Sequence, residues 1–505
     1  MRPNILLIMT DQHRADHVGF GGNQQVRTPN LDRLAEQSRV FDRAYVANPI
    51  CMPNRCSILT GRMPTSHGVL FNDRSLPPNA NTFVKSLAKS GYHTGLVGKA
   101  HIQYGMSRFT ARPMEKEPAY TDLFEEGWDT LEHPERYLAE PPVIDDFYGF
   151  KQVEFSIGHG DAVGGHHYRW ARDKGASHEE LTSREPLKQS ENWWQVRQPS
   201  LPEDYYSTTF IAERSAAFIA AQSKEQPWFL QCSFPDPHHP FTPPGKWWDA
   251  YDPADMQLPD SFTQPLGEVP VHLKRFHSFD ARGNPVQMFG INEIQLREAL
   301  AAQYGMIEMI DEGIGQVLQT LEASGQVDNT YVIFTSDHGD MFGDHGLMLK
   351  GLMHYEGCIR VPMTVKGPQI DAARSNSLVS SLDLAQTVLE LTGLEEFDHM
   401  QGVSMVPVLS DPATSIRDQV FIEEDMPMLE HVDRAPHKVR TLVTETHRTT
   451  LYSSGEKEVY DLTNDPGEFH NLAMLEPASE EVRQASDRLA LAMLNATDLS
   501  RLNRQ

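Results

Sequence analysis

The stretch ICMPNRCSILTGR, residues 50–62, decides how this chain is interpreted. Pro53 suits the first turn of a helix, and Gly61 suits the C-terminal stop of the same helix. Arg55 follows Cys51 by four residues, which is about one helical turn. The pattern predicts that Cys51 lies beside a guanidinium at a helix N-terminus, where partial positive charge favours an anion. A buried small residue next to a helix explains Cys51 equally well from this stretch alone.

The composition limits the partners and the compartment. The 505 residues include 44 basic and 70 acidic side chains and carry a formal net charge of −26 at pH 7, which disfavours nucleic acid as a partner. No apolar run approaches the roughly 18 residues of a membrane helix, so we expect no membrane contact. Residues 5–9 are too short for a secretion signal, and four cysteines in so long a chain favour reduced thiols. We therefore expect a cytoplasmic protein.

Apolar runs that end in polar residues alternate with helical patterns, as in the buried parallel strands of an α/β sheet. We expect strands at 4–10, 94–97, 228–234 and 330–335, and helices from Pro29 and near 82–90, 205–221 and 292–323. Residues 110–200 show no sustained period and are expected to form loops over one sheet edge. Short alternating runs at 439–444, 448–453 and 458–462, with a helix near 479–494, predict an antiparallel subdomain. We thus predict an α/β domain at 1–414 and a smaller domain at 415–505.

Two of the expected strands end in similar polar pairs. Asp11 and Gln12 follow the first strand, and Asp337 and His338 follow the strand that ends at 335. Ligands gather beyond the carboxyl ends of the strands in an open α/β sheet, so these four side chains are candidates to bind one divalent cation. A single pair of this kind also occurs in ordinary loops, and only the agreement of two strand ends favours a metal site.

Several segments together resemble the sulfatase family. Residues 51–55 and 59–62 are similar to its C-x-P-x-R and T-G-R signature, and further segments follow in the family's order. These segments are GKAH at 98–101, PHHP at 237–240, SDHG at 336–339, GDHG at 343–346 with Lys350, and EVYDLTNDPGE at 458–468 followed by NL at 471–472. The resemblance covers nearly the whole chain. It implies an alkaline-phosphatase-like α/β fold, with a mixed, mostly parallel sheet flanked by helices and a smaller C-terminal antiparallel-sheet subdomain.

The same resemblance implies a chemistry. Cys51 would be oxidised by a formylglycine-generating enzyme to formylglycine, whose hydrate is the nucleophile. The residues that surround the anion would be Arg55, Lys99, His101, His238 and Lys350, and the ligands of one divalent ion would be Asp11, Gln12, Asp337 and His338. His238 or Lys350 would protonate the leaving alcohol, and His101 would take the second proton of the hydrate. The implied activity is hydrolysis of small sulfate monoesters, aryl sulfates in particular, through a covalent sulfo-enzyme intermediate.

Two departures from the sulfatase pattern affect the metal and the substrate. Gln12 stands where many sulfatases have Asp, and His338 stands where several have Asn. Ca²⁺ is implied by the family, but an imidazole ligand moves the preference toward Mn²⁺. Phosphonate monoester hydrolases of the same superfamily resemble this chain in the Asp-Gln start, and Asn72 falls where they place an oxyanion-contacting Asn. Lys99 and His101 follow the sulfatase pattern instead.

Alternatives remain open from the sequence. Phosphonates or phosphodiesters are alternative substrates, and choline-type sulfatases also share the Asp-Gln start. A non-catalytic sulfatase-like protein would keep Cys51 as a thiol, and a disulfide-stabilised structural protein would protect all four thiols. His345 and Glu356 are either a second layer around the site or ordinary core residues. The expected partners are a small sulfate ester and the formylglycine-generating enzyme, and a homo-oligomer is left open.

Overall fold

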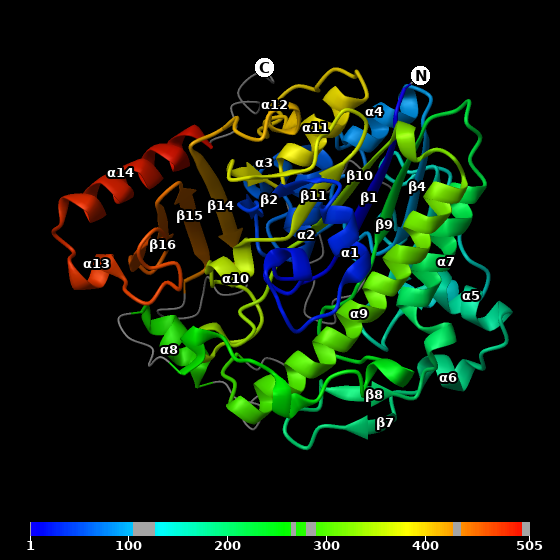
Figure 1. The fold of residues 1–505 in the computed structure, drawn as a ribbon, viewed down its shortest axis with the longest axis horizontal. Helices are drawn as coiled ribbons and strands as arrows, with labels where there is room; N and C mark the ends of the chain where they lie inside the picture. Colours follow the sequence, from blue (N-terminus) through cyan, green and yellow to red (C-terminus); the bar gives the residue numbers. More distant parts are fainter. Residues whose placement is uncertain (1, 105–126, 264–268, 279–288, 428–435, 497–505) are drawn as a thin grey trace.

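The computed structural model describes residues 2–104, 127–263, 269–278, 289–427 and 436–496. The strands of the main sheet are β1 (Asn4–Thr10), β2 (Arg39–Phe41), β4 (His93–Gly98), β5 (Gln152–Ile157), β6 (Gly164–Gly165), β9 (Trp228–Ser233), β10 (Thr330–Ser336), β11 (Met363–Lys366) and β12 (Ala373–Ser375). Within the described ranges they form one nine-stranded sheet in the order β12-β2-β11-β10-β1-β9-β4-β5-β6 (Figure 1). The central strands β10, β1, β9, β4 and β5 run parallel, and β11 is antiparallel to both neighbours. The predicted mixed, mostly parallel sheet is confirmed.

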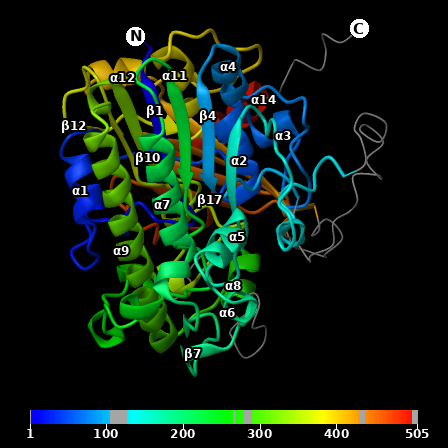
Figure 2. The ribbon, with the colours of Figure 1, turned by 90° about the vertical axis from the view of Figure 1, so that its right-hand side faces the viewer.

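Helices cover both faces of this sheet, as Figures 1 and 2 show. All seven residues of β1 are buried, and alternate residues point to opposite faces. Ile5, Leu7 and Met9 belong to one hydrophobic core, and Leu6 and Ile8 belong to a second core on the other face. The first core includes side chains of α2 (Cys51–Thr60), α4 (Phe83–Lys89) and α11 (Asp383–Leu391), and the second includes those of α1 (Pro29–Ala35), α7 (Ser207–Ala220) and α9 (Glu293–Ala323). The continuous apolar sequence of β1 follows from this double burial.

A second, antiparallel sheet lies toward the C-terminus. Its strands, in spatial order, are β14 (Gln419–Asp425), β15 (Lys438–Thr444), β16 (His447–Tyr452) and β17 (Lys457–Asp461). Helix α14 (Glu480–Asn495) packs against it through a core of Leu442, Leu489 and Ala492. We call β14–β17 the C-terminal sheet. The predicted antiparallel sheet and closing helix are thus confirmed, and the division of the chain at 414/415 stays a prediction.

The prediction of loops over residues 110–200 is wrong for much of this segment, of which 110–126 lie outside the described residues. Strand β5 joins the main sheet beside β4, where it is followed only by the two-residue β6. Glu154 in β5 forms an ion pair with Arg214 at 2.6 Å, so a polar residue interrupts the apolar pattern of this strand near the sheet edge. The same segment also contains α5 (His166–Asp173), α6 (His178–Thr182), β7 (Pro186–Gln189) and β8 (Arg197–Pro199).

The remaining helices and strands are short. They are β3 (Ala44–Tyr45), α3 (Pro64–His67), α8 (Val271–His277), α10 (Glu356–Ile359), β13 (Val379–Ser380), α12 (Val406–Ser410) and α13 (Leu472–Leu475). Among the described residues, no helix combines the length and apolar character that crossing a bilayer requires.

Candidate active site

The site begins where two parallel strands end side by side. Strands β1 and β10 are paired in register up to Thr10 and Ser336, so the residues that follow each strand meet beyond the sheet. The backbone N–H of Gln12 donates a hydrogen bond to Asp337 Oδ1 at 3.2 Å, and the N–H of Asp337 donates to Thr10 O at 3.2 Å. The two polar pairs that the sequence singled out are therefore adjacent, as expected.

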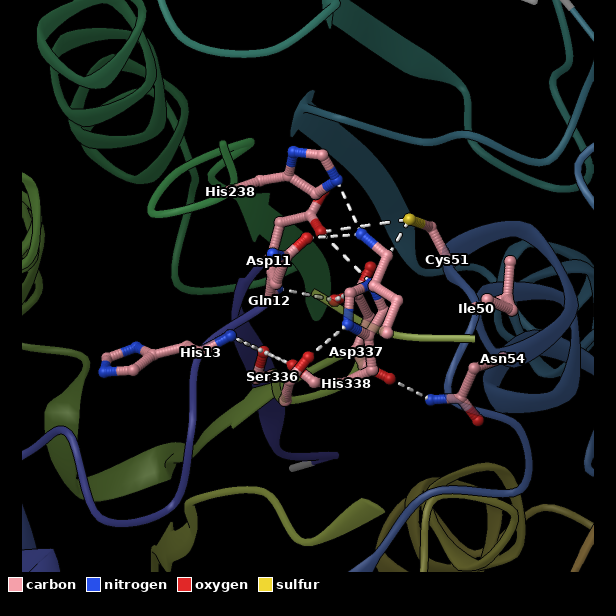
Figure 3. Close-up of polar contacts among 12 residues, drawn as sticks. Asp11, Gln12, His13, Ile50, Cys51, Asn54, His238, Ser336, Asp337 and His338 are labelled. Carbon is pink, nitrogen blue, oxygen red and sulfur yellow. Dashed lines mark hydrogen bonds and ion pairs between the residues drawn. The ribbon is translucent and has the colours of Figure 1, made fainter. Parts of the chain in front are cut away.

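Helix α2 brings Cys51 to this point. The helix begins at Cys51 and ends at Gly61, which adopts φ 63° and donates its N–H to Ser57 O. Every residue of α2 is buried, and Cys51 is only 2% exposed. Its Sγ lies 3.2 Å from His338 Nε2 and 4.0 Å from Asp11 Oδ1 (Figure 3). The predicted position of this thiol at a helix N-terminus is confirmed.

The donor atoms around Cys51 fit a divalent cation. One ligand atom from each of Asp11, Cys51, Asp337 and His338 lies within 4.8 Å of the others, and all four residues are buried. Two carboxylates and an imidazole in one buried cluster suit Ca²⁺ or Mn²⁺, because buried carboxylates are costly unless a cation compensates their charge. The side chain of Gln12 lies beside the cluster, and its Oε1 accepts a hydrogen bond from Lys350. The four predicted ligands are thus gathered in one place.

Arg55 balances the charge of this cluster. Its Nε donates to Asp337 Oδ2 at 2.6 Å, and one of its terminal nitrogens donates to Lys99 O and to Ser233 Oγ, both at 3.0 Å. The second terminal nitrogen lies 3.7 Å from Asp11 Oδ2. Burial alone would lower the pKa of Arg55, but the two carboxylates raise it. The guanidinium therefore stays charged although it is almost fully buried, with only 2% of its side chain exposed.

Lys99 reaches the Asp11 carboxylate from the end of β4. Gly98 adopts φ 110°, and a Cβ there would lie 1.9 Å from Ser233 O, so only glycine fits this turn. The Lys99 ammonium contacts the Asp11 carboxylate and lies 2.7 Å from His159 Nε2. Burial alone would raise the pKa of Asp11, but the Lys99 ammonium helps to hold it well below its ordinary value.

The pocket also favours an anion at position 51. Burial alone would raise the pKa of Cys51, but the ammonium groups of Lys99 and Lys350 lower it. Cys56 lies one turn further along α2, and burial raises its pKa well above the ordinary value. The pKa values of these two cysteines therefore shift in opposite directions, because Lys99 and Lys350 outweigh the effect of burial at Cys51, whereas burial dominates at Cys56.

Lys350 and His238 lie beside each other at the same cluster. Lys350 Nζ lies 2.6 Å from His238 Nε2, so the two groups predicted to protonate a leaving group are in direct contact. Asn72 Oδ1 accepts a hydrogen bond from the N–H of Met52 at 3.1 Å, which places it at the first turn of α2 beside Cys51. These residues join the predicted site.

His101 lies at the edge of the cluster. Its backbone N–H donates to Glu132 Oε2 at 2.5 Å, and its Nδ1 is buried without a hydrogen-bond partner among the described residues. Burial and the neighbouring Lys99 cation hold the pKa of His101 well below its ordinary value, so the imidazole is neutral.

His159 was missed by the sequence analysis. It lies between Gly158 (φ 120°) and Gly160 (φ 56°) in the loop after β5. Its ring stacks on that of His238, with centroids 3.8 Å apart and planes inclined by 18°, and its Nε2 meets the Lys99 ammonium. The flanking glycines were a local signal of a tight loop, but no pattern indicated which residues it would approach.

Two further candidates lie elsewhere. His345 and Glu356 line a separate cavity together with Arg14 and Asp465. His345 packs against the ring of Tyr355 at a centroid distance of 4.8 Å. Of the two interpretations left open, the structure favours the one in which neither residue directly supports the cluster around Cys51.

Comparisons with known proteins show the family of this chain. A family model described as Sulfatase matches residues 3–394, and one described as N-sulphoglucosamine sulphohydrolase, C-terminal, matches residues 343–494. The chain is 29% identical over 495 residues to an arylsulfatase of Clostridium perfringens, covering 95% of this chain and 92% of the relative. It is 27% identical over 481 residues to a choline-sulfatase of Rhizobium meliloti, covering 94% of this chain and 82% of the relative. Its fold is similar to that of a phosphonate monoester hydrolase of Agrobacterium radiobacter, with a TM-score of 0.79 and 23% identity over 99% and 97% of the two chains. Because the first model spans most of its length, the chain belongs to the sulfatase family.

Proposed function

We propose that this protein hydrolyses small sulfate monoesters, most readily aryl sulfates, to an alcohol and sulfate. The observation that carries the proposal is the position of Cys51, which lies in one cluster with the metal-type ligands Asp11, Asp337 and His338 and within the electrostatic influence of Lys99 and Lys350. A sulfate ester carries one negative charge, and fixed cations stabilise the charge that gathers on its oxygens without reorganisation during the reaction.

Formylglycine at position 51 fits this pocket, because the pocket already favours an anionic group there. Its hydrate supplies two hydroxyls, one that attacks sulfur and one whose proton is lost when sulfate is expelled and the aldehyde is restored. Lys350 or His238 donates a proton to the leaving oxygen as the bond between it and sulfur breaks. His101, buried and neutral, accepts the proton of the second hydroxyl.

The protein's own residues would hold one divalent ion. Asp11, Asp337 and His338 are the ligands that the geometry supports, with the amide of Gln12 beside them. The ion would act as a Lewis acid that acidifies a bound hydroxyl and polarises the ester oxygens. Ca²⁺ and Mn²⁺ are the two candidates, since the imidazole of His338 moves the preference toward the second.

A second candidate function is hydrolysis of phosphonate monoesters or phosphodiesters. The contact of Asn72 with the first turn of α2 favours it, since an amide at this place can contact an oxygen of the reacting group. A choline-type sulfate is a further alternative, because a net charge of −26 tolerates a cationic leaving group. Lys99 and His101, together at the cluster, support sulfate as the main substrate.

The test combines a mass and a rate. The protein is made with a formylglycine-generating enzyme, and the peptide that carries Cys51 should lose about 18 Da, the difference between a thiol and an aldehyde. The same preparation should hydrolyse para-nitrophenyl sulfate faster than a matched phosphonate monoester or choline sulfate. An unmodified thiol in active protein would refute the proposed nucleophile, and faster phosphonate hydrolysis would select the second candidate.

Two further expectations belong to the proposal. The formylglycine-generating enzyme is the proposed maturation partner, and an assembly of several copies is left to measurement of the mass in solution. The cytoplasm is the proposed compartment, because Cys51, Cys56, Cys232 and Cys358 are all free and buried.

A further inference from the structure

Lys350 lies in a backbone segment with an unusual conformation. Leu349 and Leu352 adopt φ 67° and 56°, and Gly351 between them adopts φ 100°. Leucine rarely adopts positive φ, because its Cβ then crowds the backbone. Such a segment persists only where the surrounding structure holds it, so the contacts on each side of Lys350 determine where its ammonium lies.

The catalytic part of the chain holds the first side of this segment. The N–H of Leu349 donates to Asp340 Oδ1 at 2.9 Å, and Leu349 O accepts from the N–H of Met341 at 2.9 Å. Asp340 follows β10 closely in sequence, so this side is attached to the strand that carries Asp337.

Buried carboxylates near the C-terminus hold the second side. Glu424 on β14 is fully buried, and its Oε2 accepts from the N–H of Leu352 at 2.8 Å and lies 3.0 Å from His354 Nε2. Two more carboxylates continue this series. The Tyr355 hydroxyl donates to Glu458 Oε1 at 2.6 Å, and the N–H of Glu356 donates to Glu468 Oε2 at 2.9 Å.

We propose that Glu424 is a positioning residue for Lys350, so that the C-terminal sheet completes the active site. This inference rests on the proposed function only through the role of Lys350. Without the carboxylate of Glu424, the buried N–H of Leu352 loses its acceptor and the positive φ of this residue loses its support. The segment then relaxes, and the Lys350 ammonium leaves its place between Gln12 and His238.

The neighbouring Glu423 offers a matched control. It is 3% exposed, lies on the same strand, and its Oε1 accepts from the N–H of Thr65 at 2.6 Å. It pairs with Arg440 and makes no described contact with the segment around Lys350. Glu423→Ala should therefore cost folding stability in the same way as Glu424→Ala without moving Lys350.

The experiment compares Glu424→Ala, Glu424→Gln and Glu423→Ala with and without Lys350→Ala. Displacement of a catalytic group by 1 Å costs about 10²-fold, so Glu424→Ala should lower kcat by at least about 10-fold, and more for a poor leaving group than for a good one. Glu424→Gln keeps an acceptor for Leu352 and should recover most of the rate. In Lys350→Ala protein, Glu424→Ala should add little, because the residue that it positions is already absent.

A second readout does not depend on turnover. Amide hydrogen exchange in the peptide that contains Leu352 should accelerate in Glu424→Ala and stay unchanged in Glu423→Ala. Unchanged exchange at this peptide would overturn the proposal. So would a double variant in which the fold-loss of kcat equals the product of the losses of Glu424→Ala and Lys350→Ala. If Lys350→Ala itself keeps wild-type turnover, the proposed function of Lys350 fails, and the exchange measurement still decides whether Glu424 holds the segment.

Discussion

Removal of Arg55 should make folding stability depend strongly on a divalent cation. Arg55→Ala takes away the ion pair of Asp337 and the nearby charge on Asp11, both of which are fully buried. Asp11 keeps the Lys99 ammonium, whereas Asp337 keeps, among the residues that the structure describes, only neutral donors and the imidazole of His338. The variant therefore contains a buried carboxylate without a strong cationic partner, which a bound metal ion would neutralise.

The size of the effect follows from this burial. Breaking a buried ion pair by removing one partner costs about 3–5 kcal/mol. With an unfolding entropy of about 2.1 cal/mol/K per residue, this 505-residue chain has about 1.1 kcal/mol/K, so the metal-free variant should melt about 3–5 °C below the wild type. A cation at about 100 times its Kd stabilises the wild type by about 2.7 kcal/mol, and it should stabilise the variant by more.

The assay is thermal unfolding in chelator and in an excess of Ca²⁺ or Mn²⁺. The rise in Tm on adding the ion should exceed that of the wild type by about 2–4 °C in Arg55→Ala. Arg417→Ala is the control, because it removes the partner of the buried Asp383 outside the cluster around Cys51. Equal metal-induced shifts in the wild type and both variants would refute the placement of the cation between Asp11 and Asp337.

Three further predictions concern single residues. Cys51→Ala should keep the far-ultraviolet spectrum and Tm nearly unchanged and abolish ester hydrolysis, and residual turnover above a mock preparation would contradict the proposed nucleophile. His159→Phe keeps a ring against His238 but loses the acceptor for Lys99, so kcat/KM should fall about 10-fold, and further in His159→Ala; equal losses would show that the stacking is unimportant. Burial raises the pKa of Asp311 to about 6, so the folded state binds the proton more tightly than the unfolded chain and loses about 2 kcal/mol here as pH rises from 4 to 7. Asp311→Asn should therefore gain Tm relative to the wild type over this pH range, and a constant difference would show that Asp311 does not titrate as described.

Strand prediction worked where both faces of a strand are buried and failed where buried charges interrupt it. The apolar runs of β1 and β10 were recognised from sequence because both strands lie in the centre of the sheet. Strand β14 was not recognised, since it carries Glu423, Glu424 and Asp425 in succession. All three are buried, and backbone amides or Arg440 satisfy them over distances in sequence that no local pattern reveals.

The candidate site shows the same division. Most of the predicted residues lie directly after β1, β4 and β10 or at the start of α2, where strand and helix termini fix their positions. His238 lies in the loop after β9, and Lys350 lies in the loop between β10 and α10. Glu132 escaped prediction, although its carboxylate accepts the N–H groups of His101, Ile102 and Gln103 and so shapes the turn after Lys99. Its partners are backbone N–H groups, which nearly every residue has, so the sequence does not indicate which of them a carboxylate will bind.

The distance along the chain between Cys51 and His338 determines how long Cys51 stays accessible for the proposed modification during synthesis. The imidazole that touches the thiol is synthesised 287 residues after it, and the strand that precedes this imidazole lies at the centre of the sheet. At about 5–20 residues per second, a ribosome needs about 15–60 s to cover that interval. The finished fold leaves 2% of Cys51 exposed, so the proposed formylglycine-generating enzyme would have to act on the chain before folding is complete. Slower translation of the middle of the message should raise the modified fraction, even though it changes no residue of the protein.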